Sequence, residues 1–361
     1  MQYSDVRSRL VLPARAALGL VVCLSVSACG DESSEAEGPE TGQGAAAACA
    51  LGDRVAVRAL IDNVELTAVA PTPVDDFASG FSILEGPTWR DGALYLSQIN
   101  ANVASPPPAR LLRYDVGAAA FVVVDPDSGS NGLQSDPAGR LAAARHSDGT
   151  ISYIDVRNPS AAPVPLATSF EGQRFNSPND LTFHPNGTLY FTDPDWQAPT
   201  PRPQSLERAY RVVPGGAPEA ITAALTEPSL VTKPNGVVVS ADEQTLYLGG
   251  SNGLFRFALD AQGAVTGTSG ERLAVTDEGV DGMTLDCAGN LYVATGNRVL
   301  VLDSAADLIG SLTVPHNPTN VEIGGANGQT LFITTLEATV NDVVSKPALY
   351  STDWSPASAA R

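Results

Sequence analysis

The sequence is poor in several residue types, and each shortage narrows what the protein can be. Basic residues are scarce, since 21 Lys and Arg stand against 40 Asp and Glu and the formal net charge is −19. This balance argues against a nucleic-acid partner, which would require a basic surface. Only three histidines are present, which leaves few zinc ligands. Aromatic residues make up 6% of the chain, whereas 33 glycines and 27 prolines favour many short strands joined by turns.

The chain also lacks an apolar run long enough to span a membrane comfortably. The run "AALGLVVCLSV" follows Arg7, Arg9 and Arg15 and ends in "SACG", which is typical of an export signal. "VSAC" resembles the bacterial lipoprotein signal, so we expect residues 1–29 to be a signal peptide that ends at a lipidated Cys29. The alternative is ordinary secretory cleavage nearby. The protein would then be an exported lipoprotein that faces the periplasm or the cell exterior and touches the membrane only through its lipid.

The segment after the signal is different in composition from the rest of the chain. Residues 30–50 are acidic or small and nearly free of large apolar side chains. They cannot bury enough surface to offset the entropy lost on ordering, so we predict a flexible acidic tether. Residues 51–361 are then the folded domain. Besides Cys29, the mature chain holds Cys49 and Cys287, which in an oxidising compartment either form a disulfide bond or stay free thiols.

One pattern recurs six times along the folded domain. Each copy has a polar residue, a short apolar strand, a turn and a second apolar strand, as in "NDLTFHPNGTLYFTD". The copies begin at Glu85, Asn131, Asn179, Asn235, Asp281 and Asn320. A repeat of about 40–50 residues with three or four strands is typical of a propeller blade. We therefore predict an all-β fold, a six-bladed β-propeller of four-stranded blades, whose ring is closed by an N-terminal strand from residues 63–70 that joins the last blade.

This architecture gives the polar residues a common place. The first strand of each blade lines the central channel, so the six polar side chains are expected to meet near the axis at one end. The second strands return to that end with Gln98, His146, Asp193, Gly250, Thr295 and Thr335. Carboxylate and amide oxygens suit calcium, whereas zinc prefers His or Cys. The sequence thus predicts an oxygen-lined cation site, although each motif taken alone is also compatible with a simple turn or local backbone hydrogen bonds.

Five stretches carry a resemblance to a known family. "EGPTW", "RFNSPNDLTFHPNGTLYFTDP", "KPNGVVVSADEQTLY", "VDGMTLDCAGNLYVATG" and "PTNVEIGG" resemble the gluconolactonase, or senescence-marker-protein (regucalcin-like), family of six-bladed propeller hydrolases over most of residues 60–350. The resemblance implies one divalent metal, often calcium, in the channel. It assigns as metal ligands Glu85, Asn179, Asn235 and Asp281. It also implies that Asp281 is the catalytic acid–base residue.

Other residues are weaker candidates. The resemblance implies substrate contacts near Arg174 and Asn176, and the ring position suggests the same for Asn131 and Asn320. His146 is a candidate to orient substrate or shuttle a proton. The alternatives are a surface ion pair for Arg174 and a hydrogen-bonded wall residue for His146.

Two local features complete the expectations. Asp180 follows Asn179 along an extended chain, so we expect it to point away from the metal and to hold the strand through backbone hydrogen bonds. Residues 100–110, "NANVASPPPAR", are a Pro-rich insertion after the first blade that we expect to form either a rim or a lid.

The leading hypothesis is a monomeric hydrolase that uses a divalent cation, most simply calcium, to open a lactone or related ester. Two alternatives stay open. One is a phosphotriesterase of the diisopropylfluorophosphatase type. The other is a non-catalytic, lipid-anchored binding module, because a fold alone does not specify chemistry.

Overall fold

The computed structural model describes residues 67–68, 81–101, 104–221, 230–336, 338–340, 343–345 and 347–353. Strands joined by turns and irregular segments make up these residues, and no helix in this part of the chain is long and apolar enough to cross a bilayer. The chain divides after residue 41, and every strand belongs to the second unit, Gly42–Arg361. The predicted signal, Cys29 and the tether of residues 30–50 lie outside the described residues and stay predictions.

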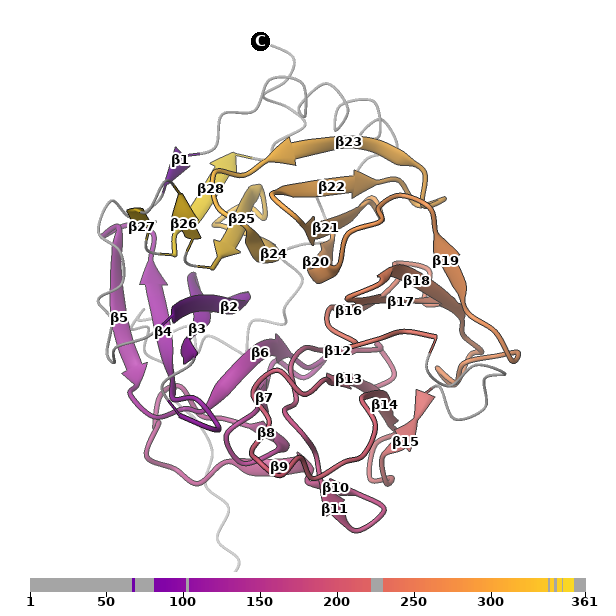
Figure 1. Cartoon of the computed structure of the whole chain (residues 1–361). Coiled ribbons are helices and arrows are strands. Elements are labelled where there is room, and N and C mark those ends of the chain that lie inside the picture. The colour runs from indigo at the N-terminus through magenta and orange to yellow at the C-terminus, as the bar shows by residue number, and fades with distance from the viewer. Residues whose placement is uncertain are drawn as a thin grey trace, which may run out of the picture. The chain divides into compact units, whose positions relative to one another are not determined.

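The strands form six four-stranded antiparallel sheets that follow one another around a ring (Figure 1). The first sheet contains β2 (Phe81–Arg90), β3 (Ala93–Ala101), β4 (Ala109–Asp115) and β5 (Ala120–Asp125). The second contains β6 (Ser130–Ser135), β7 (Leu141–Arg145), β8 (Thr150–Tyr153) and β9 (Val164–Ala167). The third contains β12 (Leu181–Phe183), β13 (Leu189–Asp193), β14 (Arg208–Val212) and β15 (Glu219–Ala220).

The remaining sheets repeat this order with one exception. The fourth contains β16 (Val237–Val239), β17 (Thr245–Gly250), β18 (Gly253–Ala258) and β19 (Glu271–Leu273). The fifth contains β20 (Val280–Leu285), β21 (Leu291–Thr295), β22 (Arg298–Leu302) and β23 (Leu308–Thr313). The sixth contains β24 (Pro318–Gly324), β25 (Thr330–Thr335), β28 (Leu349–Asp353) and β1 (Thr67–Ala68). Two small ribbons pair β10 (Ser169–Phe170) with β11 (Gln173–Arg174) and β26 (Ala338–Val340) with β27 (Val343–Ser345).

The sixth sheet closes the ring by joining both ends of the domain. β1 pairs antiparallel with β28, so that Thr67 lies opposite Ser351 and Ala68 lies opposite Tyr350. This confirms the predicted six-bladed propeller and the predicted source of the closing strand, which lies within residues 63–70.

The hydrophobic core consists of six clusters of buried residues, one at each junction between neighbouring sheets. At the closing junction, Leu84 and Leu96 of the first sheet pack with Phe332 and Leu349 of the sixth. Trp89 stacks on Phe332 there, with ring centroids 5.7 Å apart. Each sheet buries both faces only because it has a neighbour on each side, so the ring must close for every blade to be stable.

A repeated turn sets the register between first and second strands. In the second sheet, the Asp136 Oδ1 atom accepts hydrogen bonds from the backbone N–H groups of Ala138 (3.0 Å) and Arg140 (2.8 Å). Gly139 has a φ of 78°, which a side chain would strain. Asp286 plays the same part in the fifth sheet.

The turn of the fifth sheet also carries Cys287. This residue is disulfide-bonded. The other three cysteines of the chain lie outside the described residues, so the pairing of Cys287 with Cys49 stays a prediction.

Candidate active site

Side chains from four different blades meet across the ring. The charges of Asp180, in the third blade, and Asp281, in the fifth, both act on Glu85 in the first blade. The Asn320 side chain, in the sixth blade, lies close enough to Glu85 and Asp180 to lower the pKa of both carboxyl groups. Residues 235 positions apart in the sequence therefore share one site, which only a closed ring can bring about.

The polar residues reach the axis because the innermost strands are irregular there. The pairing of the innermost strand with its neighbour shifts register between Glu85 and Thr88, Ser130 and Leu133, Val280 and Met283, and Pro318 and Asn320. Such a bulge re-aims the side chains beside it. Glu85 lies in the middle of β2 and does not open the strand as expected, because residues 81–84 already pair with residues 98–101 of β3.

Three carboxyl groups gather where water is scarce. Burial, followed by the charges of Asp281 and Asp180, raises the pKa of Glu85 well above its ordinary value. Burial raises the pKa of Asp180 to about 7. Burial and the charge of Asp180 raise the pKa of Asp281 to about 8. Carboxylates that disfavour one another's ionisation in this way are stabilised by a nearby positive charge.

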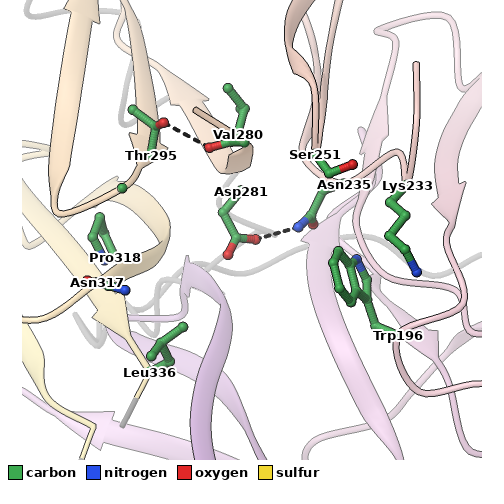
Figure 2. A pocket seen from close by; sticks show the side chains of 12 residues that line it. Trp196, Lys233, Asn235, Ser251, Val280, Asp281, Thr295, Asn317, Pro318 and Leu336 are labelled. Atoms are coloured by element: carbon green, nitrogen blue, oxygen red, sulfur yellow. Dashed lines mark hydrogen bonds between the residues drawn. The ribbon is translucent and has the colours of Figure 1, made fainter. Parts of the chain in front are cut away.

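Amide groups supply further oxygen atoms around these acids. The Asn235 Nδ2–H group donates to Asp281 Oδ1 over 2.7 Å (Figure 2). This hydrogen bond uses the amide nitrogen of Asn235 and not its Oδ1 atom. Asn131 is buried, and neither its Oδ1 nor its Nδ2 atom has a hydrogen-bond partner within the part of the chain that the structure describes. A buried amide without a partner is costly unless a ligand satisfies it. Asn179 is also buried at the ring.

The residues present therefore fit a hard cation. No group of three or more His, Cys, Asp or Glu residues forms a metal site by itself among the described residues. The donors that do converge are carboxylate and amide oxygens, the mixture that calcium accepts. The unpartnered amide of Asn131 and the raised pKa values of the acids are the two observations that support this fit.

Asp180 makes the kind of backbone contact expected of it. Its Oδ1 atom accepts a hydrogen bond from Leu181 N–H over 2.9 Å. Its charge also acts on both Glu85 and Asp281, so the three carboxyl groups form one acid cluster. Its direction relative to a bound metal stays a prediction.

A cavity of about 260 Å³ opens directly over two of the ring residues. Asp281 and Asn235 line it and are partly exposed, whereas Glu85, Asn131, Asn179 and Asn320 are buried. The remaining lining residues are Trp196, Lys233, Ser251, Gly279, Val280, Thr295, Gly296, Asn317, Pro318 and Leu336 (Figure 2). Trp196 and Lys233 were not among the predicted site residues.

Comparison with known proteins shows which family the chain resembles. The sequence profile described as "SMP-30/Gluconolactonase/LRE-like region" matches residues 83–337. The chain belongs to this family. A relative named gluconolactonase, from Zymomonas mobilis, is 28% identical over 293 residues, which cover 73% of this chain and 78% of the relative.

Solved structures of this SMP-30/gluconolactonase/LRE-like family share the fold. A gluconolactonase from Xanthomonas campestris superposes with a TM-score of 0.59 at 24% identity, covering 76% of this chain and 86% of its own. Regucalcin from Agrobacterium tumefaciens, described as a calcium-binding protein, gives 0.58 at 19% identity, covering 80% and 94%. At these identities the likeness concerns the fold.

The side chains of Arg174 and Asn176 form hydrogen bonds with backbone groups of this domain. Arg174 Nε donates to the Phe175 carbonyl over 3.1 Å, and its Nη2 donates to the His146 carbonyl over 3.2 Å. Asn176 Nδ2 donates to the Leu206 carbonyl (3.2 Å), and its Oδ1 accepts from Gln204 N–H (2.8 Å). Neither residue lines the cavity, so their predicted substrate contacts would require these hydrogen bonds to break.

His146 is also held away from the cavity. Its Nε2 atom lies 2.9 Å from the Pro107 carbonyl, which can only accept, so Nε2 carries the proton. Its Nδ1 atom is buried and has no hydrogen-bond partner among the described residues. Burial lowers the pKa of His146 to about 4, so the ring is neutral at pH 7. Pro107 belongs to the Pro-rich insertion, which His146 therefore anchors.

Proposed function

We propose that the protein is a hydrolase that opens a lactone or related ester, with a divalent cation, most simply calcium, bound in the channel. The observation that carries the proposal is the acid cluster of Glu85, Asp180 and Asp281, one member of which, Asp281, lines a cavity. The buried Asn131 amide, which has no hydrogen-bond partner among the described residues, supports it. The family membership and the relative named gluconolactonase support the lactone.

The proposed metal ligands are Glu85, Asn179, Asn235 and Asp281. A cation bound there would polarise the substrate carbonyl and stabilise negative charge that develops on its oxygen. The nearby Asp180 would add negative charge that strengthens cation binding, and the Asn320 side chain favours the charged forms of Glu85 and Asp180, because it lowers the pKa of each.

Asp281 is the proposed general base. Its Oδ1 atom accepts from Asn235, so Oδ2 is free to face the cavity. Oδ2 takes a proton from water as the water oxygen bonds to the lactone carbonyl carbon. The ring carbon–oxygen bond then breaks, and the proton passes from Asp281 to the departing oxygen. The product is the open hydroxy acid, and Asp281 ends as it began.

Metal analysis together with a substrate panel tests the proposal. The panel contains aldonolactones, acyl-homoserine-type lactones and organophosphates, each with and without a chelator. We expect lactone turnover that chelation abolishes. Turnover of organophosphates alone would favour a phosphotriesterase, and metal binding without turnover would favour a binding module.

Asp281→Asn tests the proposed base. We expect kcat to fall about 10²–10⁴-fold, the usual contribution of a positioned base, while circular dichroism stays unchanged. Asp277→Asn is the matched control, because Asp277 is an exposed acid of the neighbouring loop that pairs with Arg272. Full activity in Asp281→Asn would remove Asp281 from the mechanism.

A further inference from the structure

One wall of the cavity is an exposed indole. Trp196 is 51% exposed and is the only aromatic residue among the large, exposed apolar side chains of the described residues. It lies in the loop after β13, and it faces the cavity whose floor carries Asp281. Figure 2 shows the indole between Lys233 on one side and Asp281 on the other. An apolar surface of this size in a polar cavity suggests a ligand contact.

The indole is held on the side away from Asp281. The Lys233 ammonium lies over the Trp196 ring, 4.4 Å from its centroid, a distance typical of a cation–π contact. The same ammonium pairs with Asp195, the residue before Trp196, and lies 3.9 Å from Glu207 Oε1. The backbone N–H group of Lys233 also donates a hydrogen bond to Glu207 Oε2 over 3.1 Å. Lys233 itself has a φ of 44°, an unusual value for a residue with a side chain.

The charges of this network are already balanced. Arg202 Nη1 bridges Asp195 Oδ2 (2.8 Å) and Glu207 Oε1 (3.1 Å). Two cations, Lys233 and Arg202, therefore face two carboxylates. An ammonium with this many partners has little left for an anionic substrate, so its role is to fix the loop and the indole.

The Pro-rich insertion and the segment before Asn179 also form hydrogen bonds with the loop that carries Trp196. The Ser105 hydroxyl donates to the Ala198 carbonyl over 3.0 Å, and Gln197 N–H donates to Ser177 Oγ over 3.3 Å. The indole is thus fixed before a ligand arrives, which lowers the entropy cost of binding.

We propose that Trp196 is a substrate-binding residue whose exposed face stacks on the ring of the lactone, and that Lys233 is a positioning residue that acts through Trp196. This inference rests on the proposed function. A cavity of about 260 Å³ is slightly below the usual range of about 300–1,000 Å³ for ligand pockets, so it suits a single small ring.

Steady-state kinetics on glucono-1,5-lactone test the stacking. We expect Trp196→Ala to raise KM about tenfold and to change kcat less than threefold, because stacking contributes to binding and not to the chemical step. Trp196→Phe retains an aromatic face and should stay within about threefold of the wild-type KM. Leu206→Ala is the matched control, since Leu206 is 52% exposed nearby and does not line the cavity. An unchanged KM in Trp196→Ala overturns the proposal.

The role of Lys233 is separable by a double variant. Lys233→Met should raise KM and increase the quenching of Trp196 fluorescence by acrylamide. Lys233→Arg should leave both values near those of the wild type, because it keeps a cation over the ring. Trp196→Ala with Lys233→Met should be no worse than Trp196→Ala alone. Additive losses would show that Lys233 contacts substrate independently, which contradicts its positioning role.

A binding measurement separates this inference from the proposed function. If the wild type opens no lactone, the proposed function fails, and glucono-1,5-lactone is then titrated against the protein by tryptophan fluorescence. Trp196→Phe supplies the background from the other two tryptophans of the chain. A response that depends on Trp196 supports the binding wall without the reaction, and no response overturns it.

Discussion

At the scale of single residues, one buried carboxylate explains the motif "RFNSPND". Asp193, at the end of β13, accepts hydrogen bonds from the backbone N–H groups of Asn176 (2.9 Å) and Ser177 (2.7 Å). Ser177 Oγ in turn donates to the Pro194 carbonyl over 2.8 Å. These bonds fix the segment that leads to Asn179, so the polar residues before the ring position mainly build the site and do not line it.

His146 makes a prediction about pH. Folded protein binds a proton on His146 only below about pH 4, whereas the unfolded chain binds it below about 6.5. The unfolded state therefore holds more protons between these values, and stability falls as the pH is lowered. From pH 6.5 to 4.5 the wild type should lose about 2–3 kcal/mol more unfolding free energy than His146→Gln.

Urea unfolding of both proteins at several pH values checks this difference. The buried acids with raised pKa values contribute a slope of opposite sign, but they are common to both proteins and cancel in the comparison. Parallel profiles would mean that His146 titrates normally in the folded protein.

Site residues that occupy the same position in several repeats could be predicted from the sequence. Site residues that lie outside the repeats could not. Glu85, Asn235 and Asp281 each occupy the same position of a repeat, so their shared register pointed to one site. Trp196 and Lys233 lie in irregular loops, where no repeat indicates a direction for the side chain. Their place depends on a charge network that only the folded loop brings together.

At the scale of strands, the ring is narrow because neighbouring innermost strands touch through glycine. A Cβ atom on Gly236 would lie 2.2 Å from the Asp281 carbonyl oxygen, and one on Gly132 would lie 2.5 Å from the Asn179 carbonyl oxygen. The glycine after the polar residue is therefore required by the contact between blades. The hairpins were predictable from their period and turns, but the bulges beside Glu85 and Asp281 were not, because a bulge arises from packing across the ring.

Gly236→Ala tests this contact. We expect a loss of about 1–3 kcal/mol in unfolding free energy, the usual cost of overpacking, together with reduced lactone turnover because the Asp281 backbone must shift. Gly117→Ala is the control, since the nearest atom to its added Cβ is a side-chain oxygen at an ordinary 3.5 Å. Chemical denaturation measures both. Equal stability of the two variants would show that the innermost strands have room to spare.

At the scale of the whole molecule, stability is shared around a ring of six similar junctions. The ring is closed only if the sixth blade has all four of its strands. That blade takes three strands from the C-terminal part of the chain and one, β1, from the N-terminal part. The same closure brings Asn320 beside Glu85, so the site and the fold depend on one junction.

Removal of β1 should therefore weaken the whole domain. We compare a chain that begins at residue 42, where the second unit starts, with one that begins at residue 71, both carrying Cys287→Ser so that no disulfide bond differs. Without β1, strand β28 has an open edge and loses its pairing at Ser351 and Tyr350. We expect Tm to fall by about 3–8 °C and light scattering to show association that grows with concentration. The same Tm in both shortened chains would mean that β28 needs no partner and that the ring is closed by core packing alone.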